Sequence, residues 1–358
     1  MRAIMSAINS QEKKAALSIA TLVSLRIYGL FLIMPVFSVY AEQLPYATAL
    51  LIGLAVGVYG LTQAILQIPM GLLSDFWGRK KVMALGLLVF FAGSVVAAMA
   101  NDIYWVIVGR CVQGMGAIAS TGMAYVADVS RPEQRAKMMG IVGASIGFAF
   151  MLSFITGPIL AQWIGVKGLF WMTAVLSVFA MLLLYFTVEE PENKIKKGFS
   201  FADLIVAVKQ KDLLLLDVFV LLLHASMTAI FVVLPLILVH QLAFSTSDHW
   251  QFYLPVLLLS LFIMIPLIIL QEKRKQHVLF MLSAMLCLSF SVLSLVLGMH
   301  SLWLLAALMT IYFGLFNFLE AAMPSFLSKR ADEQYRGAAL GVYSSSQFFG
   351  AFIGGVLA

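Results

Sequence analysis

Charged residues are scarce in this sequence of 358 residues: Asp, Glu, Lys and Arg together make up 11% of it, whereas 62% of the residues are hydrophobic. A soluble globular domain carries about a quarter charged residues, so this class is excluded. Disorder requires low hydrophobicity and is excluded as well. Cysteine is also scarce: Cys111 and Cys287 both lie in apolar runs, so the sequence offers neither a disulfide framework nor a Cys-x-x-Cys metal site.

Patterns that mark enzymes are missing too. The sequence has no cluster of His, Cys, Asp and Glu with metal-ligand spacing, and no phosphate-binding glycine loop between a strand and a helix. We therefore expect no enzymatic activity, no metal and no cofactor.

Long apolar stretches dominate the chain instead. A helix that rises about 1.5 Å per residue needs about 20 apolar residues to cross a hydrocarbon core of about 30 Å. Eleven such stretches predict eleven membrane-spanning helices, and hence an all-α polytopic membrane protein embedded in a lipid bilayer. They cover residues 17–41, 48–74, 81–100, 103–129, 135–163, 167–188, 212–241, 248–270, 277–298, 301–328 and 335–358.

The distribution of Lys and Arg predicts the orientation in the membrane. If the N-terminus is cytoplasmic, 20 of the 23 basic residues fall in inner segments, one (Lys167) falls in an outer loop, and two (Arg26 and Arg110) lie within spans. Such an excess of basic residues on one side is the positive-inside pattern. The net charge of +6 does not indicate a nucleic-acid partner, because the basic residues are divided among six inner segments.

The two halves of the chain repeat each other. At an offset of 200 residues FLIMPVFSVY (31–40) lies over FVVLPLILVH (231–240), and two further helix pairs match in phase. Since six helices separate equivalent ones, both halves have the same orientation, which is the parallel repeat of one large transporter class. The further matches are Gly114 with Gly314, and Arg135, Gly140 and Ser145 with Arg336, Gly341 and Ser346.

This repeat predicts three regions. An N-terminal six-helix bundle covers 1–188, a cytoplasmic linker covers 189–211, and a C-terminal bundle of five helices covers 212–358. Within the linker, Ser200 and Asp203 have the spacing of a capping box, and apolar residues follow at helical spacing, so we expect a short amphipathic helix on the inner leaflet. The absence of a twelfth helix leaves two interpretations open, a fragment of a longer protein or a natural eleven-span protein.

Four charged residues lie inside the apolar stretches: Arg26, Arg110, Asp217 and Glu320, in the first, fourth, seventh and tenth spans. A charge at the bilayer centre costs about 2.5–3.5 kcal/mol, so these side chains must face protein or water. They predict a hydrated cavity lined by these four helices. Glu320 is the first candidate to carry a proton, since low dielectric raises the proton affinity of a carboxylate, and Asp217 and His224 are secondary candidates. Alternatively, the charges pair with one another and only hold the halves together.

The segment after the second span reads GLLSDFWGRKK and resembles motif A of the major facilitator superfamily. Gly71, Asp75, Gly78, Arg79 and Lys80 carry the resemblance. We expect Gly71 to allow a close approach of the second helix to a neighbour, as small residues do in membranes. The carboxylate of Asp75 suits a helix N-terminus, where free N–H groups favour an anion.

Other segments carry the same resemblance. Arg110, Gln113 and the glycine that follows are similar to motif B, and Gly157-Pro158 is similar to motif C, the antiporter motif, although Ser153 stands where glycine is usual. Longer strings, such as SLRIYGLFLIMPV and FLEAAMPSFLSK, resemble the YajR-type branch of bacterial drug:proton antiporters over essentially the whole chain. Relatives of this type have twelve helices and a small soluble C-terminal domain.

The resemblance implies how motif A acts. Asp75 would meet the N-terminus of the last predicted helix, near Gly337, and Arg79 would pair with Asp128 at the end of the fourth span. These contacts would close the two halves on the inner side and favour an outward-open state.

The function implied is secondary active transport by alternating access. We expect proton-coupled efflux of a small amphiphilic molecule by a monomer in a bacterial inner membrane, with the N-terminus in the cytoplasm. Uniport or symport on the same fold is a second hypothesis. A membrane receptor or scaffold that has lost transport is a third.

Overall fold

The computed structural model describes residues 9–190, 211–331 and 335–358, and within these ranges the chain forms helices and no strand. The all-α fold is therefore confirmed. The predicted surface helix near Ser200 lies outside the described residues. The helices are α1 (Ser10–Phe31), α2 (Met34–Ala41), α3 (Ala49–Trp77), α4 (Arg79–Met99), α5 (Ile103–Met115), α6 (Ala119–Val129), α7 (Pro132–Thr187), α9 (Lys211–Leu236), α10 (His249–Arg274), α11 (His277–Gly298), α12 (Leu302–Arg330) and α13 (Arg336–Leu357), with a π-helical turn η2 (Ile237–Gln241) and a 3-10 turn η3 (Thr246–Asp248).

In the described residues, ten helical spans are long and apolar enough to cross a membrane. α1 and α2 form one span, broken just before Pro35, whose ring is incompatible with an uninterrupted hydrogen-bond ladder. α5 and α6 form another, broken at Gly116. α7 holds two of the predicted spans, 135–163 and 167–188, which meet at Gly165 with φ 67° and ψ 172°. When α7 is divided there, all eleven predicted stretches are helical.

The first helix begins earlier than predicted, at Ser10 instead of residue 17, because a capping box extends it. The Glu12 backbone N–H donates to the Asn9 side chain (2.7 Å), and the Asn9 N–H donates to the Glu12 carboxylate (2.9 Å). Glu12 is buried and also accepts from Nε and Nη2 of Arg131, both at 2.8 Å. This hydrogen bonding raises the pKa of the Arg131 guanidinium above its usual value.

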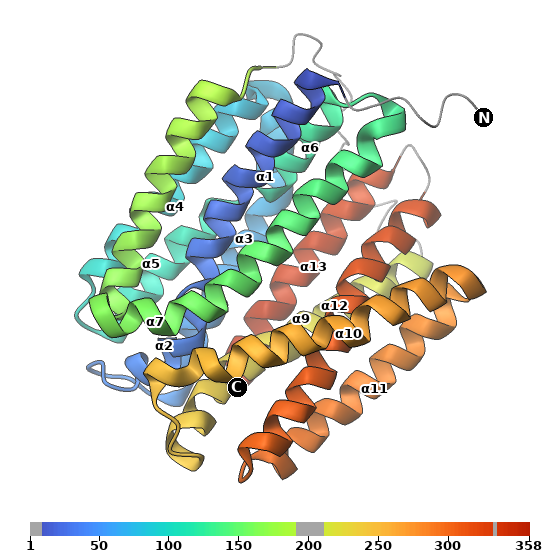
Figure 1. Cartoon of the computed structure of the whole chain (residues 1–358). Coiled ribbons are helices and arrows are strands. Elements are labelled where there is room, and N and C mark those ends of the chain that lie inside the picture. The colour runs from blue at the N-terminus through green and yellow to red at the C-terminus, as the bar shows by residue number, and fades with distance from the viewer. Residues whose placement is uncertain (1–8, 191–210, 332–334) are drawn as a thin grey trace.

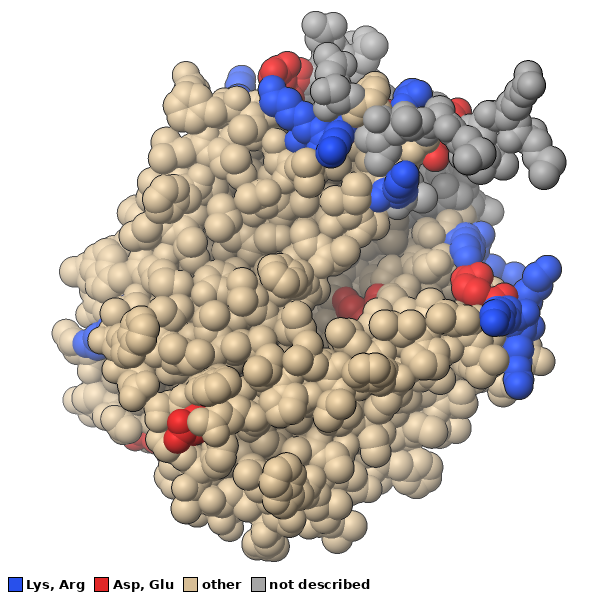
Figure 2. Space-filling model, viewed as in Figure 1, with Lys and Arg blue, Asp and Glu red and all other residues tan. Residues whose placement is uncertain are grey.

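Figure 1 shows two groups of helices, and we call residues 9–190 the N half and residues 211–358 the C half. The molecule also has two ends that differ in charge. Figure 2 shows Lys and Arg gathered at one of them, which we call the basic end. Its basic residues lie at 13–14, 79–81, 131–137, 273–275 and 329–330, and the opposite, far end carries the connections at 42–48, 100–102, 242–248 and 299–301.

The halves pack closely through α3 and α13. A Cβ added at Gly57 would lie 2.8 Å from the Phe352 carbonyl oxygen and 3.3 Å from the Gly355 Cα. One added at Gly60 would lie 2.5 Å from the Phe348 carbonyl oxygen. These glycines lie in the first half of α3, which begins at the far end, so the backbones of the two halves touch on the far-end side of the molecule.

Aromatic rings add to this contact between the halves. The ring centroid of Phe154 on α7 lies 4.6 Å from that of Phe231 on α9 and 5.3 Å from that of Tyr253 on α10. Phe31 and Phe150 join the same cluster from the N half, with their centroids 4.9 Å apart. Because these rings are large and mostly buried, they block the space between the halves.

The basic end is open by contrast. Figure 2 shows a hollow there with acidic side-chain atoms inside it. The side chain of Glu320, in the middle of α12, is 37% exposed although it lies deep in a membrane-length helix. The protein is therefore closed at the far end and accessible from the basic end.

Candidate transport site

Arg26 of α1 is buried in the N half and bound by neutral groups. Its Nη2 donates to the Tyr59 hydroxyl (2.8 Å) and to Gln63 Oε1 (3.0 Å), both on α3. Its guanidinium carbon lies 5.1 Å from the centre of the Phe90 ring, a cation–π distance. Only 2% of the residue is exposed, so in this state the Arg26 side chain is enclosed by protein and is not accessible to solvent.

Arg110 of α5 is the second buried cation, with no exposed surface. Its Nη1 donates to Gln113 Oε1 (2.9 Å) and its Nε to the Ala55 carbonyl oxygen (3.3 Å), while the Gln113 amide donates onward to Ser94. Its guanidinium carbon lies 5.1 Å from the centre of the Tyr59 ring. We call Arg26, Tyr59, Gln63, Arg110 and Gln113 the N-half cluster.

The C half holds a separate polar group. The amide nitrogen of Gln347 on α13 donates to Glu320 Oε1 (3.0 Å) and lies 2.8 Å from Nε2 of His224 on α9. His224 Nε2 and Glu320 Oε2 are 3.7 Å apart. Asp217 and Tyr343 are nearly buried beside them, and neither Asp217 Oδ1 nor the Tyr343 hydroxyl has a hydrogen-bond partner among the described residues. We call Asp217, His224, Glu320, Tyr343 and Gln347 the C-half cluster.

The sequence placed Arg26, Arg110 and the two acids around one cavity, and the structure divides them instead. Among the described residues neither arginine forms an ion pair, and Asp217 forms none either. The alternative that the four charges hold the halves together by pairing is therefore wrong for the described residues in this state. The physical reason is that each helix turns its charge toward its own half, where uncharged groups bind Arg26, Arg110 and Glu320. One polar atom of each of the four charged side chains has no hydrogen-bond partner among the described residues.

Motif A forms an ion-pair network inside the N half. Nε of Arg79 donates to Asp128 Oδ2 (2.9 Å), and Nη1 of Arg79 lies 2.5 Å from Asp75 Oδ1. Gly78 has φ 108°, a conformation that side-chain-bearing residues rarely adopt, and it forms the break between α3 and α4. Lys80 Nζ donates to the Tyr185 carbonyl oxygen at 2.9 Å.

Two expected contacts of motif A are different in this state. A Cβ at Gly71 would meet only Ser120, at 3.5 Å, so within the described chain this glycine is not at a close approach. The described contacts of Asp75 are with Arg79, and none joins it to α13 near Gly337. The motif therefore ties together helices of one half here, because the halves are apart at the basic end.

Gly157 and Pro158 lie buried in α7 at the break between α1 and α2. A Cβ at Gly157 would meet the Leu32 carbonyl group and lie 3.1 Å from Pro35 Cγ. The glycine thus allows α7 to touch the backbone of α1 where its helix is interrupted.

Sequence reasoning missed Tyr59, Gln63, Tyr343 and Gln347 as site residues, although a signal was present. The string GVY-x-x-x-Gln occurs at 57–63 in α3 and again at 341–347 in α13. In both copies the glutamine contacts a charged side chain of its own half. A search for repeated polar residues within the apolar spans would have found all four.

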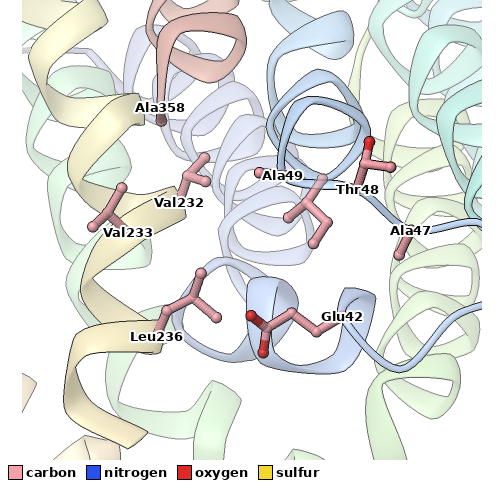
Figure 3. Close-up of a pocket in the computed structure, with 9 residues that line it drawn as sticks. Glu42, Ala47, Thr48, Ala49, Val232, Val233, Leu236 and Ala358 are labelled. Carbon is pink, nitrogen blue, oxygen red and sulfur yellow. The ribbon is translucent and has the colours of Figure 1, made fainter. Parts of the chain in front are cut away.

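Two histidines join the halves at the far end. His249 Nδ1 of α10 lies 3.0 Å from the Pro35 carbonyl oxygen, and His240 Nε2 of η2 lies 2.8 Å from Glu42 Oε2. Beside the second contact is a pocket of about 320 Å³ between α2, α3 and α9. Figure 3 shows Glu42 pointing into it opposite Leu236.

Two bundles of membrane-length helices with charged side chains buried inside them are typical of a membrane transport protein. The comparisons with known proteins identify its family. The model of the Major Facilitator Superfamily matches residues 19–355, so the chain belongs to this family. It is 38% identical to the inner membrane transport protein YajR of Escherichia coli over 97% of this chain and 77% of that protein. An uncharacterized transporter of Buchnera aphidicola is 34% identical, over 97% of this chain and 90% of that one.

A solved structure of a bacterial homologue of the human lysosomal transporter Spinster has the same fold. It superposes with a TM-score of 0.76 at 15% identity, over 98% of this chain and 82% of that one. The protein is accordingly a multi-pass membrane protein that carries out secondary transport of small molecules, and it is not an enzyme. One string, GASIG at 143–147, matches Gly-x-Ser-x-Gly, but it lies within α7 and not on the strand-to-helix turn of a nucleophile.

Proposed function

We propose that the protein exports a small amphiphilic molecule in exchange for protons. It would act as a monomer in a bacterial inner membrane, with its N-terminus and basic end in the cytoplasm. The orientation is supported by the excess of Lys and Arg at that end. The single observation that carries the proposal is that the side chain of Glu320 is 37% exposed although it lies within a membrane-length helix.

The unequal exposure of the charges supports a cationic substrate. Arg26 and Arg110 are bound by neutral partners and buried, so they present no positive charge to the cavity in this state. Glu320 is accessible and Asp217 lies beside it. A molecule that enters from the basic end therefore meets negative charge and apolar walls, which favours an amphiphilic cation.

Exchange follows if the substrate and the proton compete for the same acid. A ligand shifts the balance between two states only by its different affinity for them. A cation bound at Glu320 would displace its proton, and a proton taken up from the far side would displace the cation. Asp217 and His224 would assist as secondary proton sites.

Motif A and motif C would act on the balance between the state that is open at the basic end and the state that is open at the far end. We infer that the network of Asp75, Arg79 and Asp128 closes the basic end when the halves meet there, with Gly71, Gly78 and Lys80 shaping the loop. Gly157 and Pro158 would fix α7 against the break between α1 and α2 within the N half. This packing would hold Phe154 of α7 in place against Phe231 and Tyr253 of the C half.

Proton release by detergent-solubilised protein tests the proposal. Adding a lipophilic cation such as tetraphenylphosphonium should release protons, detected with a pH-sensitive dye, and Glu320→Gln should abolish the release. Glu272→Gln, which removes a carboxylate exposed at the protein surface, is the matched control and should release protons normally. Release by Glu320→Gln equal to that of the unaltered protein would refute proton exchange at this residue. No release from the unaltered protein would favour uniport or symport.

A further inference from the structure

Gln347 touches both titratable groups of the C-half cluster with one nitrogen atom. Its amide nitrogen is 3.0 Å from Glu320 Oε1 and 2.8 Å from His224 Nε2. A primary amide carries two hydrogens, so it can donate to both groups at once. His224 and Glu320 themselves are 3.7 Å apart, too far for a good direct hydrogen bond.

These contacts fix the protonation of the imidazole. An ionised carboxylate only accepts hydrogen bonds, so the Gln347 amide must turn its nitrogen toward Glu320 and hence also toward His224 Nε2. The other ring nitrogen, Nδ1, lies 3.2 Å from the Val220 carbonyl oxygen, which also only accepts. While Glu320 is ionised, these contacts fit the neutral tautomer of His224 with its proton on Nδ1 and a lone pair on Nε2 for the amide.

Protonation of the imidazole breaks one of the two hydrogen bonds, because a proton on His224 Nε2 would place two donors face to face. Protonation of Glu320 need not, because Oε2 has no hydrogen-bond partner among the described residues and can take the proton while Oε1 still accepts from the amide. We propose that Gln347 is the positioning residue that keeps His224 neutral beside Glu320 and that transmits proton binding at His224 to α13. The proposal rests on the proposed proton coupling and names the residue through which it acts.

The other titratable groups near the pair of His224 and Glu320 do not form hydrogen bonds with it among the described residues. They are Asp217 on α9, Tyr343 on α13 and Tyr312 on α12, whose hydroxyl contacts Ser226 instead. In the described part of the C half, no Lys or Arg forms an ion pair with Glu320. Among the described residues, the one hydrogen bond to the carboxylate is therefore that of the Gln347 amide.

The position of Gln347 on α13 connects the pair to the other half. The next residue, Phe348, presents its carbonyl oxygen to Gly60 of α3, at a point where the backbones of the two halves are in contact. A rearrangement of the Gln347 side chain therefore takes place within one residue of the interface that must open in the transport cycle. The equivalent glutamine of the N half, Gln63, accepts from Arg26, whose charge does not titrate, so it provides a matched control.

The experiment is a pH titration of the detergent-solubilised protein with ¹⁵N-labelled histidine, followed by NMR. The His224 signal is assigned by its loss in His224→Asn. In Gln347→Met, a variant of similar size without a donor, the titration midpoint of His224 should move to higher pH by about one unit, since one hydrogen bond to the neutral ring is lost. Gln63→Met should leave the midpoint unchanged. A midpoint in Gln347→Met that is equal to or lower than that of the unaltered protein would overturn the proposal.

If Gln347→Met does not fold, Gln347→Asn replaces it, because an amide shortened by one methylene cannot reach both partners and should shift the midpoint in the same direction. Transmission to α13 is measured separately with spin labels at Glu133 and Arg274, one exposed position of each half at the basic end. Acidification should change their distance in the unaltered protein and not in Gln347→Met. An equal change in both would overturn the transmission.

The titration does not depend on transport. A missing midpoint shift overturns the role of Gln347 even if Glu320→Gln abolishes proton release. A shift combined with normal proton release in Glu320→Gln supports the role of Gln347 and refutes the proposed function.

Discussion

Replacing Gly57 by alanine should shift the protein away from the state seen here. In this state a Cβ at residue 57 would lie 2.8 Å from the Phe352 carbonyl oxygen and 3.3 Å from the Gly355 Cα, so α3 and α13 would have to separate. Because both contacts are with backbone, no side chain can rotate away to relieve them. Overpacking of this kind costs about 1–3 kcal/mol. Since the cost applies only while the halves touch at the far end, it should raise the ratio of far-end-open to far-end-closed molecules roughly 5- to 150-fold.

Pulsed electron paramagnetic resonance measures this shift. Spin labels at Gln43 and Ser245, exposed at the far end on opposite halves, report the distance between the halves there. In Gly57→Ala a longer distance should gain population at the expense of the short one.

Gly143→Ala on α7 is the matched control, because a Cβ at this glycine has no heavy atom within 4 Å among the described residues. Its distance distribution should equal that of the unaltered protein. If Gly57→Ala keeps the original distribution, or if Gly143→Ala changes it as much, then close packing of α3 on α13 does not hold the far end closed.

Three further predictions concern ion pairs. Asp128→Asn removes the charged acceptor of motif A and should lower the thermal unfolding temperature and the transport rate, while a normal rate would show that the pair has no role in the cycle. Glu12→Gln leaves Arg131 without its carboxylate and should destabilise the protein by about 1–3 kcal/mol, measured by chemical unfolding; no loss would contradict its role as an anchor. At the far end, the Glu42 carboxylate lies 2.8 Å from His240 Nε2 of the other half, so Glu42→Gln should weaken the far-end-closed state by about 0.2–1 kcal/mol, measured with the same spin labels. An unchanged distance distribution in Glu42→Gln would show that this contact does not hold the far end closed.

The amino-acid sequence by itself determined the helices and their membrane environment. A membrane-spanning helix satisfies its backbone hydrogen bonds within itself, so the apolar length of each stretch predicts a span without knowledge of its neighbours. The repeat and motif A predicted the family from short stretches of sequence alone. The pairing of Arg79 with Asp128 was predicted from the resemblance to that family. Helix ends were less predictable: polar side chains at Asn9 and Glu12 extend α1 beyond its apolar stretch.

The tertiary structure decided which side chains meet. Arg26 and Glu320 both looked like cavity charges in the sequence, yet one is buried against α3 and the other is partly exposed with Gln347 as its partner. That difference depends on how each helix is rotated and on which residues face it from helices distant in the sequence. The conformational state could not be predicted from the sequence either. The balance between alternative packings of the two halves depends on only a few kcal/mol, which local sequence patterns do not encode.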